Sequence, residues 1–338
     1  MSHITFCVLL FITEFVRVQN VYIAAHGKPA PNPISAEQVQ YTKVTVLSSP
    51  PCGKICSYDW DARKDGKYYP LLHKVVNCPN TFYRMAHSPY LVVRPPPRNP
   101  PPDMLNNFTM DGQCPVSHYM YIDNSSGAKK PAPKVFKKNM FQKLLAQDNV
   151  TNVNHYKDKN VLKPALVKYK HLIQEKRVAV VGTERPWAEA ILLNLGAKSI
   201  TTIEYLELVI EHGRVGTVTP YHLAEQFING QAVPFDTVFS YSSLEHSGLG
   251  RYSDPITPFG DLEASAQVWC MVKPGGHFVL AVPVSNNRNN CSIVWNAHRI
   301  YGSVRLQHLT ANWRVLEEFN AMDYRRHRIF VLQKVFMD

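Results

Sequence analysis

The sequence predicts an α/β fold with a mostly parallel sheet, and three observations support this prediction. From about Asn139 onward, short β-branched runs alternate with runs of helical periodicity. Each run has the length that α/β folds use. The last two strand-like runs, 313–319 and 327–335, are separated by only seven residues, too few for a crossover helix. The sheet is therefore expected to end in a C-terminal antiparallel hairpin.

The expected elements follow one another along residues 140–335. In the expected helices, apolar residues recur every three to four positions, whereas the expected strands are short, mostly apolar runs. The helices are expected at 140–150, 166–176, 186–196, 221–228 and 260–272, and the strands at 177–183, 199–205, 214–220, 235–242, 275–284, 313–319 and 327–335. Alternation of this kind predicts that ligands bind beyond the carboxyl ends of the strands.

The part of the chain before the α/β pattern has a different composition. Residues 26–138 are rich in proline, tyrosine and turn-forming residues and show little periodicity. Short strands or irregular structure are expected there. The domain prediction is therefore a signal peptide at 1–25, a Cys/Pro-rich N-terminal region at 26–138 and the α/β domain at 139–338.

The first 25 residues have the pattern of a secretory signal peptide. The apolar run Ile4–Ile12 is too short to span a membrane, and Ala24 and Ala25 offer a cleavage point. A buried N-terminal helix is the alternative. Four glycosylation sequons support the secretory interpretation, and they begin at Asn107, Asn124, Asn149 and Asn290. The predicted location is outside the cell or in the lumen of the secretory pathway, with no stable membrane span.

Cysteines are concentrated in the N-terminal half. Four of the seven cysteines are Cys52, Cys56, Cys78 and Cys114, and in an oxidising compartment they are expected to pair with one another in one of three ways. Cys52 and Cys56 could instead open a zinc site, but no matching His/Cys pair follows, so no metal is predicted. Cys270 is expected to be a buried thiol.

Composition and charge limit the classes of function. The chain of 338 residues is 45% apolar and 19% charged, which is typical of a globular protein and not of a disordered one. Its formal charge is +11, but lysine and arginine are scattered. The clearest basic run, 129–138, contains one aromatic residue, Phe136, and is interpreted as a solvated linker. No nucleic-acid partner is predicted.

Candidate site residues lie where three predicted strands end. Gly182 and Thr183 end the first strand, where a glycine lets the backbone approach a ligand. Glu204 ends the second, 22 residues after Gly182, a spacing that suits an acid that binds ribose hydroxyls. The fourth strand ends in four further candidates: Ser242, Ser243, Glu245 and His246. The Glu-His pair is expected to project into the ligand crevice.

Each candidate also has a structural interpretation. Gly182 could serve only a tight turn, Glu204 could be a solvent-facing strand end, and His246 could cap a helix. Past the fifth strand, the segment 296–302 concentrates hydrogen-bonding side chains that are expected to contact substrate: Asn296, His298, Arg299 and Tyr301. The alternative for this segment is a surface helix.

Three stretches together resemble a known superfamily. Residues 178–205, 235–246 and 268–283 are similar to successive segments of class I S-adenosylmethionine-dependent methyltransferases of the small-molecule type. Within that superfamily the chain is most similar to the family called domain of unknown function number 268. The resemblance covers roughly 139–338 and implies a Rossmann-like methyltransferase-type sheet.

The resemblance implies roles for the candidate residues. Gly182 and Thr183 would line the methionine side of S-adenosylmethionine, and Glu204 would hold its ribose. Residues 242–246 would border the methyl-transfer site, with His246 as the base and Glu245 orienting it or the acceptor. The acceptor would be an oxygen or nitrogen of a small molecule or glycan.

Two departures from the family pattern leave other functions open. The first motif has one glycine, Gly182, followed by bulky Trp187, and the third strand ends in Thr219 and Pro220 where the family often has an aspartate. A catalytically inactive, methyltransferase-like binding protein, secreted or lumenal, is therefore the alternative function. A nucleotide-sugar or dinucleotide enzyme is a third possibility, although such enzymes usually have a loop with three glycines.

Overall fold

The computed structural model describes residues 76–87, 95–124, 133–147, 159–252, 254–287, 290–320 and 327–334. Its helices are α3 (Cys78–His87), α4 (Leu105–Phe108), α5 (Lys138–Gln147), α6 (Lys159–Lys168), α7 (Trp187–Asn194), α8 (Pro220–Ile228), α9 (Gly260–Met271) and α10 (Ser303–Leu309). Short 3-10 turns lie at Pro102–Met104, Lys170–Leu172 and Leu244–His246.

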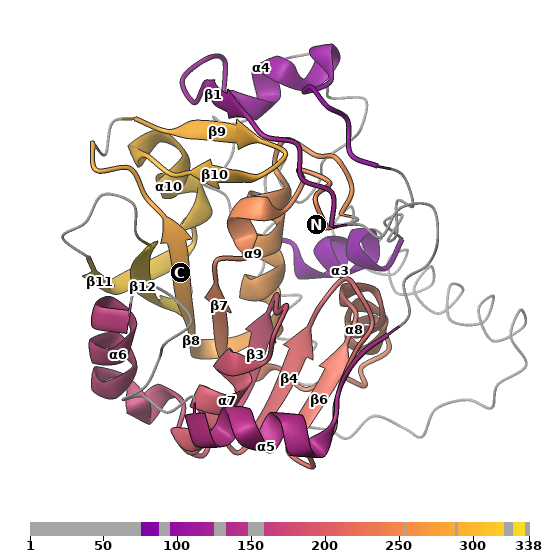
Figure 1. Ribbon diagram of the computed structural model, residues 1–338, viewed down its shortest axis with the longest axis vertical. Helices are drawn as coiled ribbons and strands as arrows, with labels where there is room; N and C mark the ends of the chain where they lie inside the picture. Colours follow the sequence, from indigo (N-terminus) through magenta and orange to yellow (C-terminus); the bar gives the residue numbers. More distant parts are fainter. Residues whose placement is uncertain are drawn as a thin grey trace, which may run out of the picture. The chain divides into compact units, whose positions relative to one another are not determined.

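The main sheet consists of β3 (Arg177–Val181), β4 (Ser199–Ile203), β6 (Val215–Val218), β7 (Phe235–Tyr241), β8 (Val272–Pro283), β11 (Trp313–Phe319) and β12 (His327–Lys334). Its strand order is β11-β12-β8-β7-β3-β4-β6 (Figure 1). The pairs from β6 to β8 are parallel, and β12 pairs antiparallel with both β8 and β11. The predicted fold class, a Rossmann-like methyltransferase-type sheet with a C-terminal antiparallel hairpin, is confirmed.

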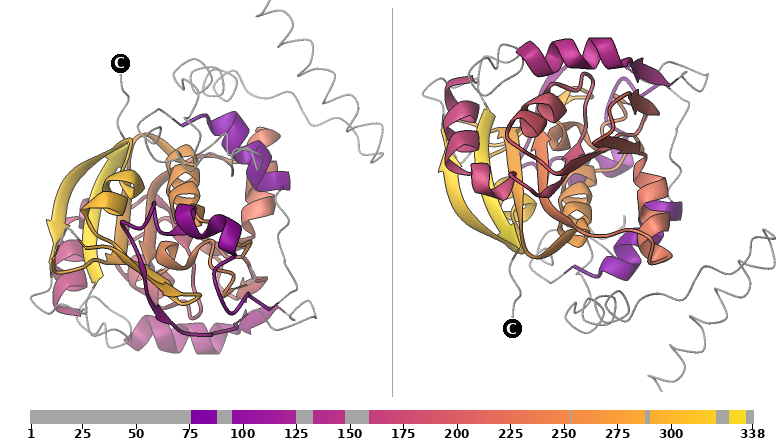
Figure 2. Two further views of the ribbon diagram at one scale, coloured as in Figure 1. Left: turned by 90° about the horizontal axis from the view of Figure 1, so that it is seen from above. Right: turned by 90° about the horizontal axis from the view of Figure 1, so that it is seen from below.

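Helices cover both faces of this sheet because side chains of a strand alternate between its faces. Val178 and Val180 of β3 pack with α5, α6 and α7, whereas Ala179 between them packs with α3, α8 and α9. All three residues are at most 1% exposed. The result is three layers, which can be followed in Figures 1 and 2. The helices cover the faces of the sheet, so the ends of its strands are where a ligand could bind.

One predicted helix is placed wrongly. The sequence suggested a helix at 166–176, but α6 ends at Lys168 and a 3-10 turn follows. The chain must then turn into β3: Gln174 forms a bridge with Ala197, and Glu175 has a φ of 56°. A helix cannot contain such a left-handed residue, so tertiary pairing overrides the helical periodicity.

Segments before residue 139 are packed onto the α/β unit. A second sheet joins β1 (Val116–Tyr119) to β9 (Ser292–Trp295) and β10 (His298–Ile300), and a third joins β2 (Lys134–Phe136) to β5 (Leu208–Ile210). Helix α3 lies beside α8 in both views of Figure 2. Phe82 of α3 stacks on Phe227 of α8, with ring centroids 4.4 Å apart.

Two disulfides tie these N-terminal segments to the α/β unit. Cys78 pairs with Cys270 and Cys114 pairs with Cys291, with Cα–Cα distances of 5.3 and 4.6 Å. Cys78 and Cys114 are therefore bridged, but the expectation that the four N-terminal cysteines pair with one another is wrong for these two. The free-thiol prediction for Cys270 is also wrong. The pairing follows from packing, since α3 lies against α9, and sequence spacing does not reveal it.

Several remaining predictions lie outside the described residues. They are the signal peptide at 1–25, Cys52, Cys56 and the sequon at Asn149. Of the other sequons, Asn107 is 6% exposed, whereas Asn124 and Asn290 are exposed. Glycosylation stays a prediction. Within the part of the chain that the structure describes, no helix combines the length and apolar character needed to cross a bilayer.

Candidate functional site

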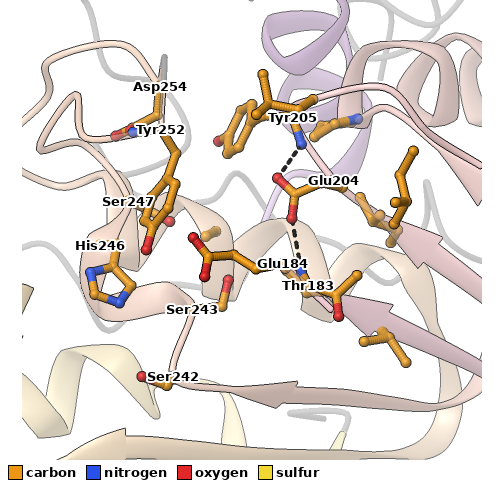
Figure 3. A pocket seen from close by; sticks show the side chains of 18 of the residues that line it. Thr183, Glu184, Glu204, Tyr205, Ser242, Ser243, His246, Ser247, Tyr252 and Asp254 are labelled. Atoms are coloured by element: carbon orange, nitrogen blue, oxygen red, sulfur yellow. Dashed lines mark hydrogen bonds between the residues drawn. The ribbon is translucent and has the colours of Figure 1, made fainter. Parts of the chain in front are cut away.

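A cavity of about 650 Å³ opens at the carboxyl ends of β3, β4 and β7 (Figure 3). The chain runs from β3 outward to β4 on one side and returns to β7 on the other, so this is the point where strand order reverses. Ligands of open α/β sheets bind at such a point. Six of the predicted residues line the cavity: Gly182, Thr183, Glu204, Ser242, Ser243 and His246.

Gly182 is required by a close approach of two strand tips. Its φ is 76°, and a Cβ atom at this position would lie 1.9 Å from Oγ of Ser243. A side chain here would be strained by its backbone conformation and would also clash. The predicted reason for this glycine was approach of a ligand, whereas in the structure the tip of β7 itself approaches it. Gly182 and Ser243 thus form one continuous stretch of cavity wall.

Glu204 connects the loops that follow β3 and β4. Its carboxylate accepts hydrogen bonds from the backbone N–H of Thr183 and of Tyr205, both at 2.8 Å. Burial raises the pKa of Glu204 above its ordinary value, and the backbone hydrogen bonds only partly oppose that effect. A carboxylate offers about four acceptor positions, so Glu204 retains capacity for ligand hydroxyls. We call the tips of β3 and β4, with Gly182, Thr183 and Glu204, the β3–β4 wall.

A second acid supports this wall from behind. Glu189 of α7 is fully buried and accepts a hydrogen bond from Oγ1 of Thr202 at 2.8 Å and one from Oγ1 of Thr183 at 3.5 Å. Burial raises the pKa of Glu189 to about 7. The sequence analysis missed this residue, although an acid inside the otherwise apolar run 186–193 was a visible signal.

The tip of β7 carries the predicted Glu-His pair, and its two members have different surroundings. His246 lines the cavity, whereas the Glu245 side chain is 1% exposed and is not among the residues that line it. Ser242, whose φ is 52°, donates a hydrogen bond from Oγ to Oε1 of Glu245 at 2.7 Å. We call this tip, with Ser242, Glu245 and His246, the β7 wall.

Hydrogen bonding fixes the proton of His246. Nδ1 forms a short hydrogen bond with the carbonyl oxygen of Ala297, which can only accept, so Nδ1 carries the proton in the neutral ring. Nε2 is then an unprotonated acceptor, 3.7 Å from Oε1 of Glu245. Burial raises the pKa of Glu245, but the positive charges that His246 and His327 carry when protonated, together with the hydrogen bonds of His327 and Ser242, outweigh burial and lower it. The carboxylate is therefore ionised beside the imidazole.

A glycine-containing loop, 247–254, completes this side of the cavity. Asp254 is 3% exposed, and its carboxylate accepts from the backbone N–H groups of Gly248, Gly250 and Tyr252 at 2.7 to 3.0 Å. The loop thereby directs Tyr252 toward the cavity, where its ring meets that of His246 edge-on at 5.4 Å (Figure 3). The sequence analysis did not identify Asp254 as the acceptor that closes this loop.

The four candidates in 296–302 lie elsewhere. Asn296, His298, Arg299 and Tyr301 are not among the residues that line the cavity, and three of them are 0% exposed. The side-chain oxygen of Asn296 accepts from the backbone N–H of Ile122 at 2.6 Å. His298 lies 6.2 Å from the His246 ring. The structure gives this segment packing contacts behind the cavity.

Arg299 supports the β7 wall from inside the protein. Its guanidinium donates to the carbonyl oxygens of Glu245, Ser247, Thr257 and Pro258. Asp261, which is fully buried, accepts from Tyr301 Oη at 2.9 Å and from Arg305 at 2.6 and 2.8 Å. Burial raises the pKa of Asp261, but the two guanidinium groups outweigh burial and lower it. This network holds the 3-10 turn that carries His246.

Part of the cavity lining is apolar. It includes Met85 of α3, Ile203, Pro220, and Val268 and Met271 of α9. An apolar pocket with a few polar groups and a volume in this range is typical of cofactor sites. Among the described residues, no group of His, Cys, Asp and Glu could hold a metal ion.

These residues fit S-adenosylmethionine. The cavity has room for a nucleoside with an amino-acid tail, its apolar lining residues suit a base, and half-buried Glu204 suits ribose hydroxyls. Exposed Glu184, whose side chain points into the cavity in Figure 3, adds a negative charge that suits a sulfonium cation.

Comparison with protein families supports the resemblance. Residues 175–334 match the model of a family described as a Caenorhabditis protein of unknown function, DUF268. The match covers just under half of the chain and confirms the predicted similarity to this family. A comparison with curated proteins finds none that matches this chain.

Solved structures with similar folds include methyltransferases. One is 1,6-didemethyltoxoflavin-N1-methyltransferase from Burkholderia thailandensis with bound 1,6-didemethyltoxoflavin and S-adenosylhomocysteine, at 15% identity over 61% of this chain and 93% of that one (TM-score 0.39). Another is the N-methyltransferase NodS from Bradyrhizobium japonicum, at 11% identity over 53% and 99% (TM-score 0.35). These likenesses are distant, so the fold assignment rests on the strand order and the family match.

Proposed function

We propose that the protein is an S-adenosylmethionine-dependent methyltransferase that acts on an oxygen or nitrogen of a small molecule or glycan. The observation that carries the proposal is the meeting of six predicted residues, from three separate strand tips, around one cavity at the switch point of the sheet. A binding site for a dinucleotide could lie at the same point. The antiparallel β12, inserted between β8 and β11, favours the methyltransferase family.

The cofactor would be held mainly by the β3–β4 wall. Glu204 would accept hydrogen bonds from ribose hydroxyls, and the loop at Gly182 and Thr183 would border the methionine portion. Apolar lining residues, among them Met85 and Val268, would enclose the base. When bound, S-adenosylmethionine supplies an electrophilic methyl group.

The β7 wall would handle the proton of the acceptor. His246 would take it on Nε2, because Nδ1 is already protonated and bonded to the Ala297 carbonyl. The resulting imidazolium would lie beside the Glu245 carboxylate, with Nε2 and Oε1 3.7 Å apart. Opposite charges at this distance in a buried site stabilise the protonated ring. His246 would therefore be the general base and Glu245 the group that stabilises its charge.

A secreted or lumenal binding protein without catalytic activity is the second candidate. Three observations favour it: Ser243 occupies the open face of Gly182, the Thr183 N–H is already bonded to Glu204, and Trp187 fills the start of α7. In either case the proposed location is the secretory pathway, which the two disulfides support. No nucleic-acid partner is part of the proposal.

Calorimetric titration of the full chain tests the proposal. S-adenosylmethionine and S-adenosylhomocysteine should bind below millimolar concentration, whereas NAD and a panel of nucleotide sugars should not. Absence of S-adenosylmethionine binding by correctly folded protein would contradict the enzymatic proposal. Binding without methyl transfer to any of a panel of hydroxyl- and amine-bearing small molecules and glycans would support the inactive binding protein instead.

A further inference from the structure

The reversed strand β12 brings a second histidine to the β7 wall. His327 is the first residue of β12 and pairs in register with Pro283 of β8. Its ring stacks on that of Tyr241, the last residue of β7, at a centroid distance of 5.0 Å and an interplanar angle of 29°. This position places its Nε2 atom 3.5 Å from Oε1 of Glu245.

Glu245 therefore faces two imidazoles with the same oxygen atom. Oε1 lies 3.7 Å from Nε2 of His246 and 3.5 Å from Nε2 of His327, and it accepts the hydrogen bond of Ser242. Oε2 is buried and has no hydrogen-bond partner. A buried carboxylate with so few donors is costly unless a positive charge lies beside it. One protonated imidazole supplies that charge.

A second proton on the cluster is disfavoured. Two imidazolium ions around one carboxylate would leave a net positive charge beside the buried Glu245 side chain, and the guanidinium of Arg299 already bonds to the Glu245 carbonyl. Other titratable or charged groups that face the cluster from neighbouring elements include Arg251, Tyr252, His298 and Tyr301. Glu184 and Glu204 are carboxylates that line the same cavity and act on Tyr252, whereas Glu245 is the carboxylate that lies within 3.7 Å of both rings.

We propose that His246 and His327 share the Glu245 carboxylate so that only one of the two rings is readily protonated at a time, which makes His327 a positioning residue for the base. When His327 is neutral, the charge of Glu245 is available to stabilise a proton on Nε2 of His246. When His327 is protonated, its positive charge compensates the Glu245 carboxylate, which then stabilises a proton on His246 less. The catalytic consequence rests on the proposed function, whereas the coupling between the two rings does not.

Histidine ring resonances of the full chain, followed by NMR across the pH range, test the coupling without any ligand. In the wild-type protein the signals of His246 and His327 should titrate with midpoints separated by more than about one pH unit, because strongly coupled groups lose their protons in two steps. Coinciding, independent midpoints would overturn the proposal. This measurement needs no variant that could fail to fold, once the two signals are assigned.

Variants then test whether His246, His327 and Glu245 are the groups that are coupled. His327→Phe keeps an aromatic ring on Tyr241, and His246→Gln keeps a donor for Ala297. Whichever ring titrates at the lower pH in the wild type should rise by about one pH unit when the other is replaced. Glu245→Gln should lower both midpoints. The control His212→Gln, at a ring that packs on Phe141 away from the cavity, should change neither.

The outcomes separate this inference from the proposed function. If neither midpoint moves in the variants, the inference is wrong even in an active methyltransferase. If the rings are coupled but the protein transfers no methyl group, the inference stands and the enzymatic proposal fails. If both hold, His327→Phe should also shift the pH profile of turnover in the same direction as the midpoint of His246, with the affinity for S-adenosylmethionine unchanged within about twofold, a result that a merely structural stacking role would not produce.

Discussion

At the β3–β4 wall the cavity is shaped by contacts between neighbouring loops, whereas at the β7 wall it is shaped by groups from parts of the chain that are more distant in sequence. Glu204 bonds to backbone N–H groups of two adjacent strand ends. His246 and Glu245 depend on Ala297, Arg299 and His327, which lie about 50 to 80 residues further along the chain. The first wall is thus suited to fixed binding contacts, and the second to groups whose charge changes.

The largest expected effect is on the support of the β7 wall. Asp261→Ala would leave the buried guanidinium groups of Arg299 and Arg305 without their carboxylate. Removing one partner of a buried ion pair typically costs about 3–5 kcal/mol, so denaturant unfolding should show a loss of this size. The control is the more exposed ion pair between Lys168 and Glu317. Its loss in Glu317→Ala should have a far smaller effect on the free energy of unfolding. Equal effects would contradict this account of the network.

His246→Gln separates the two walls functionally. Loss of a general base typically lowers turnover by about 10²–10⁴-fold, while the β3–β4 wall and its cofactor contacts remain. Release of S-adenosylhomocysteine in the presence of an accepted substrate measures the first effect, and calorimetry measures the second. A variant that loses cofactor affinity to the same extent as turnover would show that the walls are not independent.

Glu189→Gln should change how stability depends on pH. The pKa of Glu189 is raised from 4.5 to about 7 in the folded protein, so the folded state binds this proton more tightly than the unfolded state. The contribution of Glu189 to the free energy of unfolding is fully present below about pH 4.5. It is lost as the pH rises through about 7, by an amount on the order of 1–3 kcal/mol. The midpoint temperature of thermal unfolding should therefore fall less steeply from pH 5 to pH 8 in the variant than in the wild type. An unchanged slope would exclude the buried, protonated carboxyl.

Gly182→Ala tests the contact between the two walls. The substitution combines an unfavourable φ of 76° with a clash against Ser243, so a loss of about 1–3 kcal/mol in unfolding free energy is expected. The double variant with Ser243→Gly should recover the part due to the clash but not the part due to φ. If the second substitution recovers nothing, the tips of β3 and β7 do not touch as described.

The smallest expected effect concerns the β3–β4 wall itself. Glu204→Gln removes the charge and turns one acceptor into a donor, which should weaken S-adenosylmethionine binding by about tenfold. Glu225→Gln on α8 is the matched control, because Glu225 does not line the cavity. Affinity that is unchanged in Glu204→Gln would exclude Glu204 as the ribose ligand.

The sequence alone determined the strands of the main sheet, the helices α7, α8 and α9 between them, the terminal hairpin and the residues at the strand tips. It did not predict β5, β9, β10 or α10. The features that it determined are local: periodicity marks each element, and in a parallel sheet every strand tip lies at the same edge. Gly182 and Glu204 could be identified because each follows directly on its strand, and His246 because it lies five residues past the end of β7. The missed Glu189 was also visible locally, as an acid within an apolar helix.

Only the tertiary structure decided which residues meet across the chain. The pairing of Cys78 with Cys270, the burial of Arg299 and Tyr301 behind the cavity, and the approach of His327 to Glu245 all join segments that are far apart in sequence. The end of α6 at Lys168 was decided in the same way, by the pairing of Gln174 with Ala197. Such contacts depend on how layers pack and on the order of strands in the sheet, and a pattern along one segment carries no information on its distant partners.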